Sequence, residues 1–315
     1  MPHSSSTPAI EKLTDIIKES AHTLGFEKVG IAPATPLDSE ADRLDEWLHH
    51  GRHATMNWMA VRSDERKNIL NYFPEAKSVI CVGMNYFHGN ADGEMKISNY
   101  AWGDDYHVLL KERLYQLLES VKERLPDVTG VACVDTSPVM EKVWAQRAGL
   151  GWIGKHTNLI SRDYGSWLFL GELILDCELD YDDRFEEDLC GSCTACLDAC
   201  PTDAIVEDYL VDSRRCISYL TIEHRGDLPD EFAGQLGEWI YGCDICQEVC
   251  PWNQKFSQKS REPLFAPTSE IVERNPEEWS RLTEEEYRRI FRNSPVKRAK
   301  FTGLKRNIQS VLSNS

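Results

Sequence analysis

The sequence lacks an apolar segment long enough to cross a membrane, for which a helix needs about 20 residues in a row. The longest candidate, residues 167–175, is interrupted by Gly171 and Glu172 and predicts a buried strand. The first residues also lack the basic and then apolar arrangement of a secretory signal. No arginine precedes Arg43, which argues against a twin-arginine export signal. We therefore expect a protein of the cytoplasm, with no membrane partner.

Positive charge is scarce in most of the chain. The formal net charge of −17 argues against indiscriminate binding to nucleic acid. Residues 288–315, however, contain eight Lys or Arg and no Asp or Glu, which leaves −25 for residues 1–287. Such a basic segment is either a solvated helix surface or a surface that binds the phosphates of one substrate. The sequence leaves both possibilities open.

Cysteine, by contrast, is plentiful, and eight of the eleven cysteines follow one pattern. Residues 190–201 have the spacing C-x2-C-x2-C-x3-C-P, and residues 243–251 repeat it without the first cysteine, for which Cys216 is the remote replacement. In ferredoxins with this spacing, the fourth cysteine of each run binds the other cluster. The pattern predicts two [4Fe–4S] clusters. The expected ligands are Cys190, Cys193, Cys196 and Cys250 for one cluster, and Cys200, Cys216, Cys243 and Cys246 for the other.

Zinc and disulfides are the alternative uses of such cysteines. Zinc sites use isolated C-x2-C pairs, whereas both runs here are longer and end in Cys-Pro. Disulfide frameworks are typical of short secreted chains rather than of a long acidic chain. The pattern therefore favours clusters that carry electrons one at a time.

Helical and strand-like patterns alternate in the first part of the chain, which indicates an α/β domain over residues 1–178. A ferredoxin-like two-cluster domain is expected over 179–256, and a short, basic, helical segment over 257–315. We expect helices near 10–24, 109–125 and 139–148, and strands near 29–32, 77–84, 128–135, 158–161 and 167–175. The near-continuous apolar run at 77–84 is expected to be covered on both faces.

The segment 149–154 reads G-x-G-x-x-G, the fingerprint of dinucleotide-binding folds. That fingerprint requires a strand before the glycines and a helix after them. Here a helical pattern precedes them and a strand follows, so we reject a nicotinamide dinucleotide site. The glycines instead predict that the backbone approaches another surface closely.

Asp135 closes an apolar strand and is followed by Thr-Ser-Pro. An acid at the end of a buried strand of an α/β domain lies where ligands bind, which makes Asp135 a candidate catalytic residue. The alternative is a helix cap or turn residue. Nearby, residues 105–107 match the start of the D-x-H-x-x-G motif of some cobalamin proteins, but Leu110 replaces the glycine. A cobalt-ligating role for His107 is therefore not supported.

Together these segments resemble the epoxyqueuosine reductases, iron–sulfur and cobalamin enzymes of tRNA modification. The resemblance spans almost the whole chain in the same order, and it is specific because cluster motifs are combined with the segments around Asp135 and Gly149. The matching segments are residues 99–107, 134–142, 148–155, 190–202, 241–253 and 294–307.

The resemblance implies reduction of epoxyqueuosine to queuosine at the wobble position of tRNA. It further implies a nitroreductase-like α/β domain with base-off cobalamin, an external one-electron donor, electron transfer through the clusters to cobalt, and Asp135 as proton donor. A monomer is expected. The residues expected to line the corrinoid are Met56, Asn57, Trp58, Tyr106, His107, Thr157, Asn158, Ile217, Ser218, Tyr241 and Gly242. Those expected to bind tRNA phosphates are Lys297, Arg298, Lys300 and Arg306.

Some members of this family continue into a helical HEAT-like repeat, and this chain stops at Ser315, at about the first helix of such a region. We expect tRNA contacts of that extension to be missing. Two other functions fit parts of the pattern. A corrinoid reductive dehalogenase shares the α/β domain and two clusters, and a non-catalytic ferredoxin-type carrier would bind a protein partner and no corrinoid.

Overall fold

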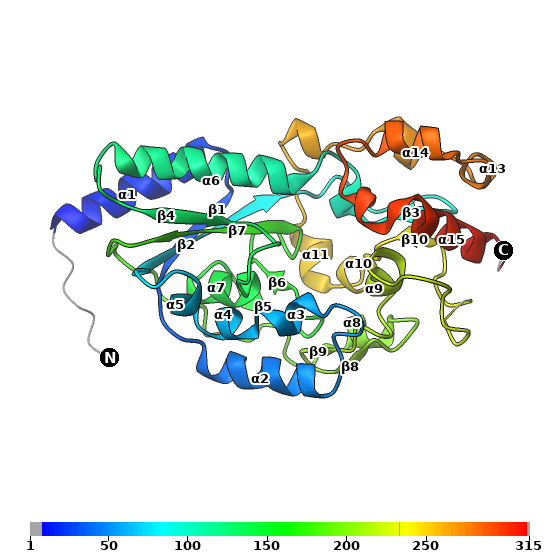
Figure 1. Ribbon diagram of the computed structural model, residues 1–315, viewed down its shortest axis with the longest axis horizontal. Coiled ribbons are helices and arrows are strands. Elements are labelled where there is room, and N and C mark those ends of the chain that lie inside the picture. The colour runs from blue at the N-terminus through cyan, green and yellow to red at the C-terminus, as the bar shows by residue number, and fades with distance from the viewer. Residues whose placement is uncertain (1–7, 233, 314–315) are drawn as a thin grey trace.

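The first part of the chain is built around a four-stranded sheet (Figure 1). The structure is a computed structural model that describes residues 8–232 and 234–313. The strands lie in the order β1-β2-β7-β4, and all three pairings are antiparallel. The mixed α/β class is confirmed, although alternating helices and strands are more typical of parallel sheets. The strands span Lys28–Pro33 (β1), Ser78–Asn85 (β2), Gly130–Cys133 (β4) and Leu168–Leu175 (β7).

Helices cover both faces of this sheet. One face packs against α1 (Pro8–Thr23) and α6 (Tyr106–Lys122), and the other against α7 (Glu141–Arg147) (Figure 1). Every residue of β2 and β7 is buried. The expectation that the apolar run at 77–84 is covered on both faces is therefore confirmed, because a strand between two helical layers has no solvated side.

Short elements surround the α7 side of the sheet. Four helices connect β1 to β2, and a small hairpin follows α7. The glycine-rich segment 149–154 thus follows a helix and contains the first strand of this hairpin, whereas a dinucleotide site has the strand before the glycines and the helix after them. These elements are α2 (Asp38–His49), α3 (Trp58–Val61), α4 (Ser63–Lys67), α5 (Ile69–Tyr72), β5 (Trp152–Ile153) and β6 (Leu159–Ile160).

The cysteine-rich region follows the sheet and is built from short elements joined by loops. The helices α8 and α10 contact each other, and each lies inside one of the two cysteine runs. The strand β10 pairs in parallel with β3, which belongs to the segment between β2 and α6. The elements are β3 (Lys96–Ile97), α8 (Ala195–Asp198), β8 (Ile205–Glu207), β9 (Leu210–Val211), α9 (Ile217–Ile222), β10 (Trp239–Tyr241), α10 (Ile245–Glu248) and α11 (Pro251–Phe256).

The last part of the described chain is helical, and two of its helices begin with capping boxes, at Asn275 and Thr283. Within the described residues, no helix is both long and apolar enough to cross a membrane. The helices are α12 (Ser269–Val272), α13 (Pro276–Ser280), α14 (Glu284–Ile290) and α15 (Lys300–Leu312), and the 3-10 turns are Asn99–Ala101, Pro263–Phe265 and Pro295–Ala299.

One hydrophobic core contains residues from all three predicted domains. It packs Ile97 of the first, Tyr241 of the second, and Trp279 and Leu304 of the third against one another. The boundaries at 178 and 256 remain predictions. This shared core means that the three segments do not each bury a separate set of apolar residues.

Candidate functional site

Four cysteines line a cavity of about 170 Å³ in the cysteine-rich region, which we call the outer cavity. They are Cys190, Cys193 and Cys196 from the first run and Cys250 from the second. Cys193 is exposed, whereas Cys196 and Cys250 are buried. This group is the set that the spacing predicts for one cluster, including the ligand exchanged between runs.

The other four cysteines of the pattern line a second cavity, of about 330 Å³, which we call the inner cavity. Cys200, Cys216, Cys243 and Cys246 lie on one side of it. The other walls come from the sheet and the hairpin, including Phe169 of β7, so this cavity lies between the cysteine-rich region and the sheet.

The donor atoms of both cavities suit iron–sulfur clusters. Each cavity presents four thiols, which are the soft ligands that iron–sulfur clusters use. None of the eleven cysteines forms a disulfide. Asp244 also lines the inner cavity, but its carboxylate accepts hydrogen bonds from Ser98 Oγ at 2.5 Å and from the Asn99 N–H at 2.7 Å.

The residues expected to line the corrinoid fall into two groups. Five of them line the inner cavity and six do not. The five are Tyr106, Thr157, Asn158, Ile217 and Ser218. The six are Met56, Asn57, Trp58, His107, Tyr241 and Gly242.

Two of these six are structural neighbours of the inner cavity. Tyr241 is buried and donates a hydrogen bond to the Pro295 carbonyl at 2.8 Å. Gly242 has a φ of +68°, and a Cβ atom there would lie 2.4 Å from Ser98 Cβ. Both residues hold the backbone in place behind the cavity wall rather than face its interior.

Asp135 lies at the centre of a three-residue turn just after β4. The N–H of Thr136 donates to the Val134 carbonyl at 2.5 Å, and Asp135 itself has a φ of +52°. A turn of this kind is rare and strained for a residue other than glycine. The N–H of Asp135 donates to Glu141 Oε1 at 2.5 Å, which ties the turn to α7. The Asp135 side chain is 55% exposed.

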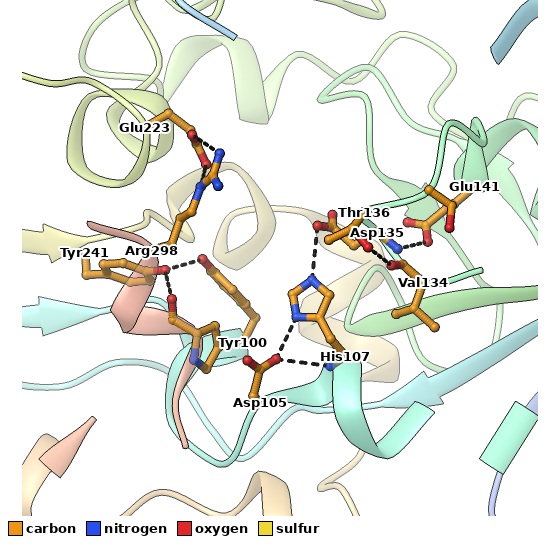
Figure 2. A network of polar contacts seen from close by, with 12 residues as sticks. Tyr100, Asp105, His107, Val134, Asp135, Thr136, Glu141, Glu223, Tyr241 and Arg298 are labelled. Atoms are coloured by element: carbon orange, nitrogen blue, oxygen red, sulfur yellow. Dashed lines mark hydrogen bonds and ion pairs between the residues drawn. The ribbon is translucent and has the colours of Figure 1, made fainter. Parts of the chain in front are cut away.

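His107 lies between two carboxylates (Figure 2). Its Nε2 is 3.1 Å from Asp135 Oδ2, and its Nδ1 is 2.6 Å from Asp105 Oδ1. Burial acts against the imidazolium, but the hydrogen bonds and charges of the two aspartates outweigh it and raise the pKa of His107 to about 9. His107 is therefore a cation at neutral pH and donates from both nitrogens.

Glu141 and Lys142 are residues of this site that the sequence analysis did not single out. Burial, and then the nearby charge of Asp135, raises the pKa of Glu141 to about 7. Lys142 lines the inner cavity and donates to Asn158 Oδ1 at 2.9 Å. Both residues belong to the segment 134–142 that carried the family resemblance, and that was the only sequence signal for them.

The basic C-terminal segment contributes to an open hollow of about 530 Å³, which we call the cationic hollow. Lys297, Arg298 and Lys300 line it together with Trp58, a residue that is 45% exposed. Arg298 makes two 2.7 Å hydrogen bonds to the carboxylate of Glu223. Trp58 thus lies among cations rather than at the inner cavity, where the resemblance had implied it.

Arg306 differs from the other basic residues. Its guanidinium donates to the carbonyls of Leu220 at 2.7 Å, His224 at 3.1 Å and Gly226 at 2.7 Å. It also donates to Asn307 Oδ1. A phosphate-binding role for Arg306 does not fit this geometry, because its donors already hold α15 to the loop after α9.

Comparison with known proteins adds family evidence to this geometry. A family model described as a 4Fe–4S double cluster binding domain matches residues 189–253. A second, described as "Epoxyqueuosine reductase QueG, DUF1730", matches residues 66–136. An epoxyqueuosine reductase of Cellulophaga algicola is 46% identical over 300 residues, which cover 95% of this chain and 97% of the relative. One of Synechocystis is 46% identical over 291 residues, which cover 90% and 100%.

This chain belongs to the epoxyqueuosine reductases. Members of this family are oxidoreductases, and the resemblance inferred from the sequence is confirmed. The double-cluster match confirms that residues 189–253 form a domain for two [4Fe–4S] clusters.

Solved structures of epoxyqueuosine reductases share this fold. The Bacillus subtilis enzyme has a TM-score of 0.87 and 29% identity, with 96% of this chain and 82% of the other covered. That structure shows an aspartate catalytic loop swung out of the active site. Another, with 30% identity and a TM-score of 0.86, covers 96% of this chain and 81% of the other. It contains an epoxyqueuosine-modified stem loop of tyrosine tRNA.

Proposed function

We propose that this epoxyqueuosine reductase converts epoxyqueuosine in tRNA to queuosine, with Asp135 as proton donor. One observation carries the proposal. Asp135 is held in a strained turn beside His107, whose ring stacks on Tyr106 in the wall of the inner cavity. The charge of Asp135 acts on Lys142, which lines the inner cavity, and on Arg298, which lines the hollow.

The reaction explains why one chain needs both clusters and an acid. Conversion of an epoxide to an alkene releases the oxygen as water, so it consumes two electrons and two protons. Two one-electron carriers can deliver the electron pair, and an acid near the oxygen can deliver a proton. General acid catalysis of this kind contributes about 10²–10⁴-fold to a rate.

The residues around Asp135 suit that role. The imidazolium of His107, whose Nε2 lies 3.1 Å from Asp135 Oδ2, can supply the proton that Asp135 passes to the substrate oxygen. Glu141 holds the backbone of the turn through the Asp135 N–H. Exposure of the Asp135 side chain lets it exchange its proton with water between turnovers.

The inner cavity is the proposed site for the cobalamin that the family resemblance implies. Its lining would suit one apolar face of the corrin ring beside a cluster, because Tyr106, Ile217 and Phe169 line the same space as the four thiols. Thr157, Asn158 and Ser218 would provide the polar contacts. Bound there, cobalamin supplies a strong nucleophile for the strained ring of the epoxide.

We infer that electrons enter at the outer cavity and leave from the inner one. Cys193 is exposed at the outer cavity, where an external one-electron donor can approach. The inner cavity shares its walls with the sheet, from which β4 leads to Asp135. The nitroreductase-like character of the sheet domain, the cytoplasmic location and the monomeric state stay predictions.

The cationic hollow is the proposed surface for the tRNA backbone. Lys297 and Lys300 are exposed and form no ion pair within residues 8–232 and 234–313. Phosphate contacts of this kind position a nucleic acid without reading its sequence. Trp58 offers an aromatic face in the same hollow, and stacking on a single-stranded base stabilises binding by about 1–3 kcal/mol.

The test is an assay of the Asp135→Asn variant, loaded anaerobically with iron, sulfide and cobalamin. Conversion of epoxyqueuosine to queuosine in tRNA is followed by mass spectrometry of the nucleosides, with a low-potential chemical reductant. We expect a rate at least about 10²-fold below that of the unaltered chain, at equal iron and cobalt content. The matched control is Asp45→Asn, on the exposed side of α2, which should keep full activity.

Three outcomes would overturn the proposal. Full turnover by Asp135→Asn would show that Asp135 is not the proton donor. Turnover of halogenated organics in place of modified tRNA would make the chain a reductive dehalogenase. Iron binding without cobalt, even with cobalamin supplied, would favour the electron carrier.

A further inference from the structure

His156 lies between the two cysteine-lined cavities. Among the described residues, it is the single residue that lines both the outer and the inner cavity. It is also the one histidine that lines either. Its side chain is buried, with 4% of the residue exposed. His156 is therefore part of the wall shared by both predicted cluster sites.

The β5–β6 hairpin holds His156 in this position. The Gly154 N–H donates to the Asn158 carbonyl at 2.8 Å, and the Thr157 N–H donates to the Gly154 carbonyl at 2.7 Å. A Cβ atom at Gly154 would lie 2.5 Å from Ile160 Cδ1 and 3.2 Å from His156 Cε1. The hairpin tip is therefore tight, and glycine at 154 leaves room for the imidazole.

The imidazole has one engaged nitrogen and one without a partner. Nδ1 of His156 accepts from the Asn158 N–H at 3.2 Å. A neutral imidazole that accepts at one nitrogen carries its proton on the other, so the proton is on Nε2. Nε2 has no hydrogen-bond partner within the described residues. A buried donor without a partner is destabilising, so such a group calls for an explanation.

The charge state of His156 agrees with this assignment. Burial, followed by the positive charge of Lys142, lowers the pKa of His156 to about 4. The ring is therefore neutral at physiological pH and offers one N–H. No carboxylate lies within hydrogen-bond distance of Nε2 to take it up.

We propose that the Nε2–H of His156 donates a hydrogen bond to a sulfur of one of the two clusters and thereby raises the reduction potential of that cluster. The sulfides and thiolates of a cluster are acceptors, and they carry more negative charge after reduction. A donor at this place stabilises the reduced form, which is one of the means by which proteins set cluster potentials. His156 is then a positioning residue that sets the relative potentials of the two electron carriers. The inference rests on the two clusters of the proposed function, and not on the substrate.

The experiment is an anaerobic redox titration of the full chain, loaded with iron and sulfide alone and followed by electron paramagnetic resonance. His156→Leu removes the donor at similar volume. We expect the ratio of reduced to oxidised cluster at a fixed potential to fall about tenfold for one cluster, which equals about 59 mV for one electron. The other cluster keeps its midpoint. His156→Gln, whose amide N–H can replace the donor, should recover part of the shift.

A second measurement needs no variant. In the unaltered chain with ¹⁵N-labelled histidine, the reduced cluster should show a hyperfine coupling to a ring nitrogen. Absence of this coupling would overturn the inference, and so would unchanged midpoints in a fully loaded His156→Leu variant. If the His156→Leu variant does not bind iron, the hyperfine coupling in the labelled, unaltered chain tests the inference instead. A chain that binds no clusters at all would instead refute the proposed function.

Discussion

Electrons and protons are handled in two regions of this molecule whose surroundings are opposite. The cysteines line cavities closed by the sheet, the hairpin and one another, and most of them are partly or fully buried. Asp135 is 55% exposed, lies in a strained turn and has charged neighbours, His107 and Glu141. Solvent exposure is one of the factors that set the potential of a cluster, whereas a proton donor must be recharged from water. Electron transfer and proton donation should therefore be separable by mutation.

The largest expected effect comes from the cysteine-lined cavities, through which we expect the electrons to pass. Cys216→Ser removes the predicted remote ligand of the cluster expected at the inner cavity, so we expect about half of the iron and no measurable turnover. The matched control is Cys177→Ser, since Cys177 lines neither cavity. Iron analysis and nucleoside mass spectrometry check both variants. Full iron content in Cys216→Ser would show that another residue is the fourth ligand.

The next effect comes from the turn around Asp135 and should leave the iron and cobalt content unchanged. Glu141→Ala removes the acceptor of the Asp135 N–H, and the strained turn loses its tie to α7. We expect the single-turnover rate to fall about 10- to 100-fold, as one lost hydrogen bond to a charged group would allow. Glu141→Gln keeps an acceptor oxygen and should lose much less. Equal losses in the two variants would mean that the charge of Glu141, rather than its hydrogen bond, matters.

The unfolding free energy should also depend on pH through His107, which lies beside Asp135. Because the pKa of His107 is raised from 6.5 to about 9, its stabilisation is complete below about pH 6.5 and is lost as the pH rises through 9. The shift corresponds to at most about 3 kcal/mol of unfolding free energy. Chemical denaturation between pH 6 and 10 should show this loss in the unaltered chain and not in His107→Asn. An identical slope for the two chains would contradict the pKa assignment.

The smallest effect should touch neither region. Lys297→Ala and Lys300→Ala should each reduce the slope of log affinity for tRNA against log salt by about 1, with the rate at saturation unchanged. Arg281→Ala, exposed at the end of α13, is the control and should leave the slope as it was. If affinity does not depend on salt, the hollow is not the tRNA surface.

The sequence predicted what depends on local spacing. In ferredoxins with this spacing the fourth cysteine of each run binds the other cluster, which predicts two sets of four cysteines, and each set does line one cavity. The doubly covered strand at 77–84 followed from its apolar run. The rejection of a dinucleotide site at 149–154 followed from the order of helix and strand.

What the sequence could not predict depends on long-range geometry. The antiparallel order of the sheet depends on how the chain connects strands that are distant in sequence, and apolar periodicity does not report that. Arg306 has the same charge as Lys297, and only the position of the backbone carbonyls after α9 separates a structural arginine from an exposed lysine. The role of Glu141 depends on the positive φ of Asp135, which has no sequence signature.

The last helix has a consequence for the order in which the enzyme is made. Asn307 of α15 donates to the carbonyls of Thr221 at 2.9 Å and Ile240 at 2.8 Å. These two carbonyls belong to the segments that follow Cys216 and precede Cys243. On the ribosome, all eight cysteines emerge before α15, because they precede it in the chain. The segments that flank Cys216 and Cys243 therefore gain these two hydrogen bonds only after α15 has been made and has folded against them.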